Sequence, residues 1–256
     1  MQNEPFDQEL TWAYELGMRS EWLDGLLRVN ATGFFYDVND LQVQTVVNNS
    51  IVVNNAAGAE VYGFEVDGSV SITDSFSVDF AATYLETEIT EVEVDAAIDP
   101  TRISVASDPT LQAVVSGGGI VPPTGAFNIL GNELPKAPQI QFNIGINYTI
   151  DFESGADLTF RGDWSFQDSI FFNQFNDTGF AALPVNPITQ DSYHWLKARL
   201  TYTGASGNWS ASVFADNLTD EEVITNAVYN GAVSGQLGLG SLAPPRTYGV
   251  SLGYSF

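Results

Sequence analysis

The sequence contains no cysteine, only one histidine and few basic residues. Without cysteine there is no disulfide framework and no thiol nucleophile. The 8 Lys and Arg residues stand against 32 Asp and Glu residues, which gives a formal net charge of −24 at pH 7. This balance argues against a nucleic-acid partner, because nucleic-acid binding depends on basic patches. It is compatible with divalent cations or with acidic, solvated loops.

Long apolar runs are also absent. No stretch of about 18 apolar residues occurs, which excludes transmembrane helices. The first ten residues, MQNEPFDQEL, lack the basic and apolar regions of a secretory signal, so an exported protein would carry its signal further upstream. The sequence has one histidine, no Ser–His–Asp set and no paired carboxylates, so it offers few residues that could carry out nucleophilic catalysis. We therefore expect no enzyme, no catalytic residues, no cofactor and no dedicated metal site.

What the sequence does contain is alternation of apolar and polar residues. In the last segment Tyr248, Val250, Leu252, Tyr254 and Phe256 alternate with Thr, Gly and Ser. The pattern predicts nine strands, at 11–22, 26–38, 60–72, 76–85, 140–150, 158–166, 196–202, 209–215 and 246–256. Eleven charged residues in or directly beside these strands fall on the polar side: Glu15, Arg19, Arg28, Glu65, Asp67, Asp79, Asp157, Arg161, Asp163, Lys197 and Arg199. A bilayer would enforce such sorting, since a charge on the lipid side costs roughly 2–4 kcal/mol near the midplane.

Short and long connections alternate between the expected strands. Short turns are expected at 23–25, 73–75, 152–155 and 203–207, the first of them around an Asp-Gly pair. Long loops are expected at 39–57, 86–136, 171–190 and 218–245, and the first could extend its hairpin beyond a membrane. Turns at one end and loops at the other are typical of an outer-membrane β-barrel. A soluble β-sandwich also alternates, but its strands usually have only about five or six residues.

Five stretches also resemble the C-terminal part of TonB-dependent receptors, which are ligand-gated outer-membrane importers. They are YELGMRSEWLDGLLRVNATGFFYDVNDLQV (14–43), GAEVYGFEVDGSV (58–70), LPKAPQ (134–139), VFADNLTDEEV (213–223) and PPRTYGVSLGYSF (244–256). They occur in the family's order and leave out only the variable loops. Each motif marks barrel architecture, and none marks a ligand.

The resemblance implies an all-β, antiparallel transmembrane barrel of 22 strands around an N-terminal plug domain that carries the TonB box. Residues 1–256 would then supply the last nine strands of an incomplete domain. The plug and the first barrel half would be absent from this sequence. An open nine-strand sheet would expose two unpaired edges in lipid, so we expect a partial sequence or one half of a split or decayed gene.

As to function, the resemblance implies multi-pass insertion in a Gram-negative outer membrane and active import of a scarce nutrient. The implied partners are outer-membrane lipid, the missing plug and N-terminal strands, TonB acting through that plug, and a small-molecule ligand. Ferric siderophores are the commonest ligands of the family, beside cobalamin, haem and carbohydrates, and the sequence leaves this choice open. A passive porin and a secreted β-sandwich binding protein remain as alternatives.

Five basic residues fall on the polar side of the expected strands, which would face a barrel lumen. These candidate contacts for an anionic substrate or for plug and lumen carboxylates are Arg19, Arg28, Arg161, Lys197 and Arg199. Pairing with carboxylates is the favoured interpretation, because Glu15, Asp67 and Asp163 share that side.

Other conspicuous residues have plainer explanations. The aromatics Tyr14, Trp22, Tyr36, Tyr62, Tyr84, Tyr148, Trp164, Tyr202, Trp209 and Tyr254 could stack on sugars, but most are expected in interfacial girdles. His194 is expected at the interface, at an outer strand end. The acidic cluster Glu86, Glu88, Glu91, Glu93, Asp95 and Asp99 could hold calcium, although a solvated loop is favoured. The ligand-like stretch 216–221 matches the outer end of the family's penultimate strand.

Overall fold

The computed structural model describes residues 6–47, 50–92, 130–174, 176, 189–230 and 237–255. Within these ranges every regular element is a strand. No helix in this part of the chain is long and apolar enough to cross a membrane. The all-β prediction is therefore confirmed.

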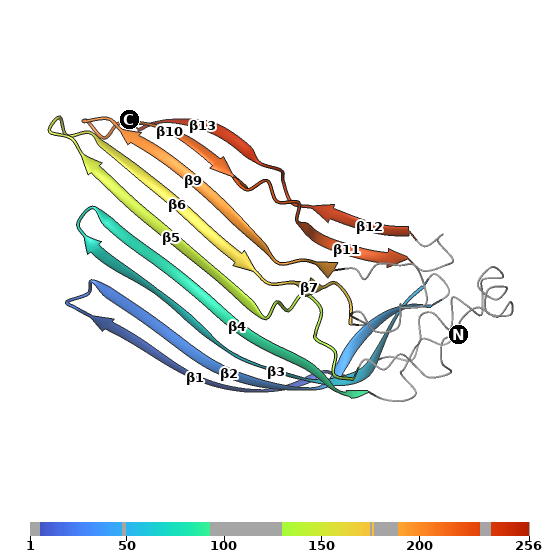
Figure 1. The fold of residues 1–256 in the computed structure, drawn as a ribbon. Helices are drawn as coiled ribbons and strands as arrows, with labels where there is room; N and C mark the ends of the chain where they lie inside the picture. Colours follow the sequence, from blue (N-terminus) through green and yellow to red (C-terminus); the bar gives the residue numbers. More distant parts are fainter. Residues whose placement is uncertain are drawn as a thin grey trace.

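Nine long strands lie side by side in one antiparallel sheet (Figure 1). They are β1 (Leu10–Trp22), β2 (Leu27–Val47), β3 (Ser50–Thr73), β4 (Phe76–Val92), β5 (Ile140–Asp151), β6 (Asp157–Gln167), β9 (Tyr193–Thr203), β10 (Trp209–Asp216) and β13 (Thr247–Tyr254). They follow one another across the sheet in this order, and every neighbouring pair is antiparallel. The nine predicted strands are thus all present, and each lies beside the next along the chain.

The short turns gather at one end of the sheet, and the described ends of the long connections lie at the other (Figure 1). In the first turn Leu23, Asp24 and Gly25 all have positive φ, at 56°, 55° and 88°. Asp and Gly tolerate this left-handed conformation best, which explains why Asp-Gly reverses the chain here. The predicted alternation of turns and loops is confirmed where the structure describes them.

Two predicted loops contain structure that the sequence did not reveal. Loop 171–190 begins and ends in a small sheet of β7 (Ile170–Phe171) and β8 (Thr189–Gln190). Loop 218–245 holds a hairpin of β11 (Ile224–Asn230) and β12 (Leu237–Leu242). The start of loop 86–136 is also strand, because β4 continues to Val92. The prediction of irregular structure was wrong for these residues.

The β2–β3 hairpin continues well past the expected strand ends, as its loop allowed. The pairing shifts between Val38 and Leu41, where Asp40 has a φ of 58°. Such a bulge bends a strand and increases its twist. The Asn55 side chain donates a hydrogen bond to the Asp40 carbonyl (2.7 Å) and so ties the bulge to β3. Beyond it the hairpin bends away from the line of the sheet (Figure 1).

The pairing register places one set of residues on a single face of the sheet. This set contains every described residue that was expected on the apolar side. Directly paired residues on adjacent antiparallel strands share a face. One row across six strands is Val78, Ile146, Gly162, Ala198, Ala215 and Tyr248. We call the side that carries this row the apolar face. The opposite side, which carries the five candidate cations, is the polar face.

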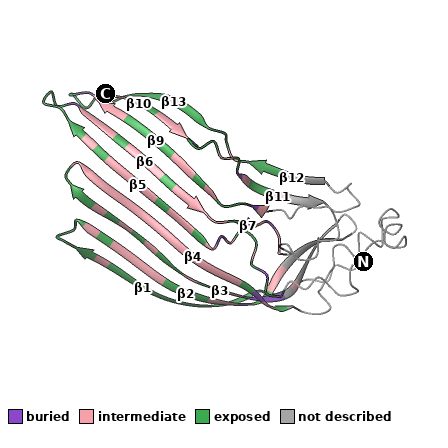
Figure 2. Ribbon diagram, viewed as in Figure 1, coloured by how far each residue is buried: buried purple, intermediate pink, exposed green. Residues whose placement is uncertain are grey.

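The sheet is a single layer with almost no core. Most residues of the sheet are half-buried or exposed (Figure 2). On the apolar face Leu252 is 83% exposed, while Phe80 and Ile144 are half-buried. The small cluster of Ala57 and Ile89, with Leu41 and Leu134 packed against it, lies at the end of the long loops. In the described residues no second sheet covers the apolar face, so the β-sandwich alternative does not fit this fold.

Candidate functional site: charges on the polar face

Arg161 of β6 lies at the centre of the polar face. Its Nη1 and Nη2 atoms donate to the two carboxylate oxygens of Asp79, at 2.5 and 3.0 Å. Its Nε donates to Asp163 at 2.8 Å. Asp79 belongs to β4, so the side chain crosses the whole of β5 to reach it. A planar guanidinium held at both sides by carboxylates is a strong form of ion pair.

Gly145 of β5 makes this crossing possible. It is paired with Asp79 on one side and with Asp163 on the other. A Cβ at this position would overlap the Arg161 guanidinium and the Asp79 carboxylate. The missing side chain therefore leaves the seat in which the guanidinium lies, between the two carboxylates.

Lys197 of β9 has its own carboxylate partner. Its Nζ lies 3.3 Å from Oδ2 of Asp216, at the end of β10. The indole nitrogen of Trp195 donates to the other oxygen of Asp216, at 2.5 Å. Lys197 is thus neutralised within the wall. Like Arg161, it contacts a carboxylate on another strand.

Arg28 and Arg19 line a polar groove over β1, β2 and β3. The groove has a volume of about 880 Å³, and Glu15, Glu21 and Asp67 also line it. Arg28 pairs with Glu21 at 3.2 Å, and both side chains are more than half exposed. Arg19 forms no ion pair with any described residue. In water such exposed pairs contribute little to stability.

Arg199 differs from the other cations of β6 and β9. Its guanidinium carbon lies 4.8 Å from the ring centre of Phe214, and Nη1 donates to Ser212 Oγ at 3.1 Å. It forms no ion pair with a described carboxylate. Three of the five predicted cations, Arg28, Arg161 and Lys197, therefore pair with carboxylates of the described wall, and two do not. Of these carboxylate partners the sequence analysis had singled out Asp163, but not Glu21, Asp79 or Asp216.

One expected girdle residue lies on the wrong side for that role. Tyr36 is on the polar face, where its hydroxyl donates to Glu15 at 2.5 Å and its ring stacks on Phe34. It follows Phe35 directly, and successive strand residues point to opposite faces. Since Phe35 lies on the apolar face, Tyr36 cannot, and its assignment to the girdle is corrected.

His194 lies on the apolar face at the loop end of β9, paired with Phe166. Its Nδ1 accepts a hydrogen bond from the Trp164 indole at 3.2 Å, and its ring lies 5.0 Å from that of Phe166. The predicted position at a strand end is therefore observed. His194 therefore packs in an aromatic cluster with Trp164 and Phe166.

The acidic cluster of the sequence is only partly described. Glu86, Glu88 and Glu91 belong to β4 and not to a loop, while Glu93, Asp95 and Asp99 lie outside the described residues. Glu86 accepts two hydrogen bonds from the Gln139 amide, at 3.0 and 2.9 Å. In the described part of the chain no three His, Cys, Asp or Glu side chains converge as metal ligands would.

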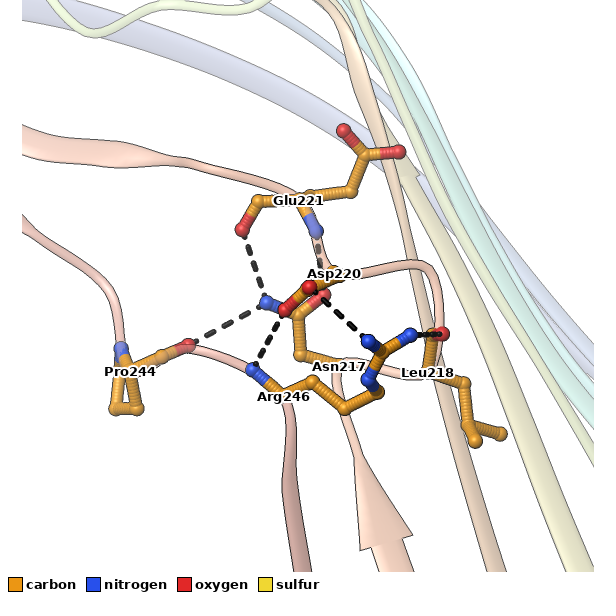
Figure 3. Close-up of polar contacts among 6 residues, drawn as sticks. All are labelled: Asn217, Leu218, Asp220, Glu221, Pro244 and Arg246. Carbon is orange, nitrogen blue, oxygen red and sulfur yellow. Dashed lines mark hydrogen bonds and ion pairs between the residues drawn. The ribbon is translucent and has the colours of Figure 1, made fainter.

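Stretch 216–221 forms a clamp at the loop end of β10 (Figure 3). Asn217 is fully buried, with a φ of 54°. Its side chain accepts from the Glu221 amide (2.9 Å) and donates to the carbonyls of Glu221 (2.9 Å) and Pro244 (3.4 Å). Arg246 pairs with Asp220 at 3.1 Å and donates to the Leu218 carbonyl. These contacts join the end of β10 to the start of β13, so the ligand-like pattern is structural.

A one-layer antiparallel sheet with one apolar and one polar face is the wall of a β-barrel. In a comparison with models of protein families, residues 1–218 match the family described as TonB dependent receptor-like, beta-barrel. The chain belongs to this family. The sequence-based recognition is thereby confirmed.

Several solved structures of similar fold are siderophore receptors, and one is the copper transporter OprC. The ferric yersiniabactin uptake receptor FyuA from Yersinia pestis aligns with a TM-score of 0.70 and 21% identity, over 99% of this chain and 31% of its own. The siderophore receptor PiuA from Acinetobacter baumannii aligns with a TM-score of 0.65 and 19% identity, over 98% and 29%. The ferripyoverdine receptor of the Pseudomonas aeruginosa outer membrane aligns with a TM-score of 0.59 and 16% identity, over 99% and 28%. The chain spans less than a third of the length of these proteins.

Proposed function

We propose that this chain is the C-terminal part of the barrel of a TonB-dependent outer-membrane importer of a ferric siderophore. The observation that carries the proposal is the sorting of the sheet into two faces. The apolar face would contact lipid, and the polar face, with its cations and carboxylates, would contact the aqueous interior. Family membership supports the importer class. The ferric ligands named for similar folds support the choice of ligand.

Strand direction supports the incompleteness of the barrel. The nine strands alternate in direction, so β1 and β13 run the same way. Joining these two edges directly would create a parallel pair in an otherwise antiparallel sheet. Antiparallel closure needs an odd number of further strands between them. A second copy with the same membrane orientation also fails, because each of its edge strands would run parallel to the edge strand that it joins. We therefore propose that further strands of a longer receptor close the barrel.

Location is tested by fractionating cells that express the receptor from its own gene. We expect the protein to sediment with the outer membrane on a density gradient and to require detergent for extraction. Recovery in the soluble fraction would contradict the membrane assignment.

Transport is tested in an iron-limited strain that lacks its other siderophore receptors. We expect the receptor to restore growth on at least one ferric siderophore, and deletion of tonB to abolish that growth. Uptake that persists without TonB would indicate a passive porin instead. Growth restored only by cobalamin, haem or a carbohydrate would support the importer class but contradict a ferric siderophore as the ligand.

A further inference from the structure

Five hydroxyl side chains form a row across the polar face, one on each of five neighbouring strands of the sheet. Register pairs them in sequence: Thr149, Thr159, Thr201, Ser212 and Ser251. We call this the hydroxyl row. The Thr149 and Thr159 hydroxyls lie 3.0 Å apart, within hydrogen-bonding distance. The row offers donors and acceptors without charge, and Arg199 lies in the next row toward the long loops.

The Arg199 guanidinium is held in place by residues of the wall itself. Phe214 lies beneath it, and that ring in turn covers Gly249, where a Cβ would collide with it. Ser212, a member of the hydroxyl row, accepts one hydrogen bond from Nη1. One face of the guanidinium is therefore covered by a ring and one edge is fixed. Stacking on an aromatic ring suits a guanidinium because of its flat, weakly hydrated surface.

Among the described residues of this region, Arg199 is the cation that the neighbouring carboxylates leave unpaired. Arg161, its direct cross-strand partner, is occupied by Asp79 and Asp163. Lys197, two residues away on the same strand, is paired with Asp216. Arg199 keeps the remaining donors of a planar fork, and that fork matches the two oxygens of a carboxylate.

We propose that Arg199 and the adjoining hydroxyl row bind the carboxylate and hydroxyl groups of an anionic solute on its way along the lumen. This inference rests on the proposed function, in which the polar face lines that lumen. A solute is favoured over a resident protein segment, because Phe214 and Ser212 orient the guanidinium without help from a partner. A site that is preorganised when empty suits a ligand that arrives and leaves.

Strand direction gives the order of contacts along the wall. β9 begins at the loop end with Tyr193 and reaches the short-turn end at Thr203. A solute that enters from the loops would therefore meet the Lys197–Asp216 pair first, then Arg199, and then the hydroxyl row. The carboxylate would be held at Arg199 while its hydroxyl groups contact the next row inward.

The test uses the full-length receptor, purified in detergent, with citrate as the probe because it combines carboxylates with a hydroxyl. Isothermal titration measures citrate affinity for the wild type and for Arg199→Gln. We expect the wild type to bind citrate in a salt-sensitive manner, and the variant to bind about three- to tenfold more weakly. Arg199→Lys should recover part of the loss, since it restores the charge without the fork.

Two further variants separate positioning from folding. Ser212→Ala and Phe214→Leu leave Arg199 in place but remove its supports, and each should weaken citrate binding about twofold. Arg246→Gln removes a carboxylate-paired arginine outside the polar face and should bind citrate like the wild type. Heat-dependent mobility on gels confirms that each variant barrel is folded.

Several outcomes would overturn the inference. These are wild-type receptor that binds no citrate, equal binding by Arg199→Gln, or an equal loss in Arg246→Gln. A lower unfolding temperature for Arg199→Gln with unchanged citrate binding would assign the residue to a resident protein partner instead. Because the titration needs no TonB, the importer proposal and this site can fail separately.

Discussion

Arg161 lies across Gly145 in the polar face, so that a side chain from β6 binds a carboxylate on β4. The contact between Arg161 and Asp79 depends on the absence of a side chain at Gly145, on the strand between them. It ties three strands together in a sheet that has almost no core of its own. The relationship leads to a direct test of what stabilises this wall.

Replacing Gly145 with valine should displace Arg161 from its seat and separate it from Asp79. The carboxylates are about half exposed, at 50% for Asp79 and 41% for Asp163, so solvent screening limits the loss. We expect a decrease of about 1–3 kcal/mol in the free energy of unfolding. Urea unfolding of the detergent-solubilised receptor, followed by tryptophan fluorescence, measures it. Gly33→Ala is the matched control, because its nearest neighbour would be 3.9 Å from the new Cβ. Equal effects of the two substitutions would contradict a specific role of the space above Gly145 in holding Arg161.

Ile144 and Asn143 are adjacent on β5 and lie on opposite faces, so they test which face meets lipid. Ile144 is paired with Phe80 and Trp164 on the apolar face. Arginine at position 144 should cost roughly 2–4 kcal/mol if that face lies in the bilayer near its midplane. Arginine at position 143 should be tolerated. Outer-membrane yield and heat-dependent gel mobility of the two variants provide the comparison. Equal assembly of both would contradict a lipid-facing apolar side.

Asn217 should be the most sensitive residue of the outer clamp. Replacing it with alanine removes three hydrogen bonds from a fully buried position and leaves the Glu221 amide without its acceptor. We expect a loss of about 2–4 kcal/mol, since unsatisfied buried groups are costly. The exposed Arg246–Asp220 pair is the internal control, and Arg246→Gln should cost at most about 1 kcal/mol. Hydrogen exchange at the Ala243 amide, which donates to the Val223 carbonyl, reports opening of the clamp. Equal protection in both variants would rule out a dominant role for Asn217.

Glu133 predicts a pH dependence in the segment before β5. Its partial burial raises the pKa of its carboxyl above the ordinary 4.5, and Glu86 and Asp168 raise it further. Because the folded-state pKa exceeds the unfolded value, protonation favours the folded segment. This stability is fully present below pH 4.5 and is lost as pH rises through the raised pKa. The protection factor of the Leu134 amide, which donates to Thr87 Oγ1, should therefore fall over that range.

Glu133→Gln should raise that protection at neutral pH and abolish its pH dependence. Glu153→Gln, in the short turn at the opposite end of the sheet, should leave both unchanged. Loss of the pH dependence in Glu153→Gln, or its persistence in Glu133→Gln, would assign the titration to another group.

Alternation was enough to place most residues on the correct face. Ile144 and Asn143 were separated by the period of two that every strand imposes. Tyr36 was grouped with the girdle aromatics by its residue type, although its position next to Phe35 places it on the polar face. The β11–β12 hairpin was missed because its short strands, such as Leu237–Leu242, lack an extended alternating pattern. These errors arose where chemical character competed with geometry, or where a segment was too short to show a period.

By itself, the sequence determined the nine strands of the main sheet, its two faces and the alternation of turns and loops, because each follows from local periodicity and turn chemistry. Only the tertiary structure decided the partners. Alternation put Arg161 and Asp79 on the same face, but their contact depends on register across β5 and on the empty space above Gly145. The same holds for Arg199, which has no carboxylate partner among the described residues, and this became visible only once the neighbouring strands were in place. Pairing distances between strands are set by long-range register, which no local pattern encodes.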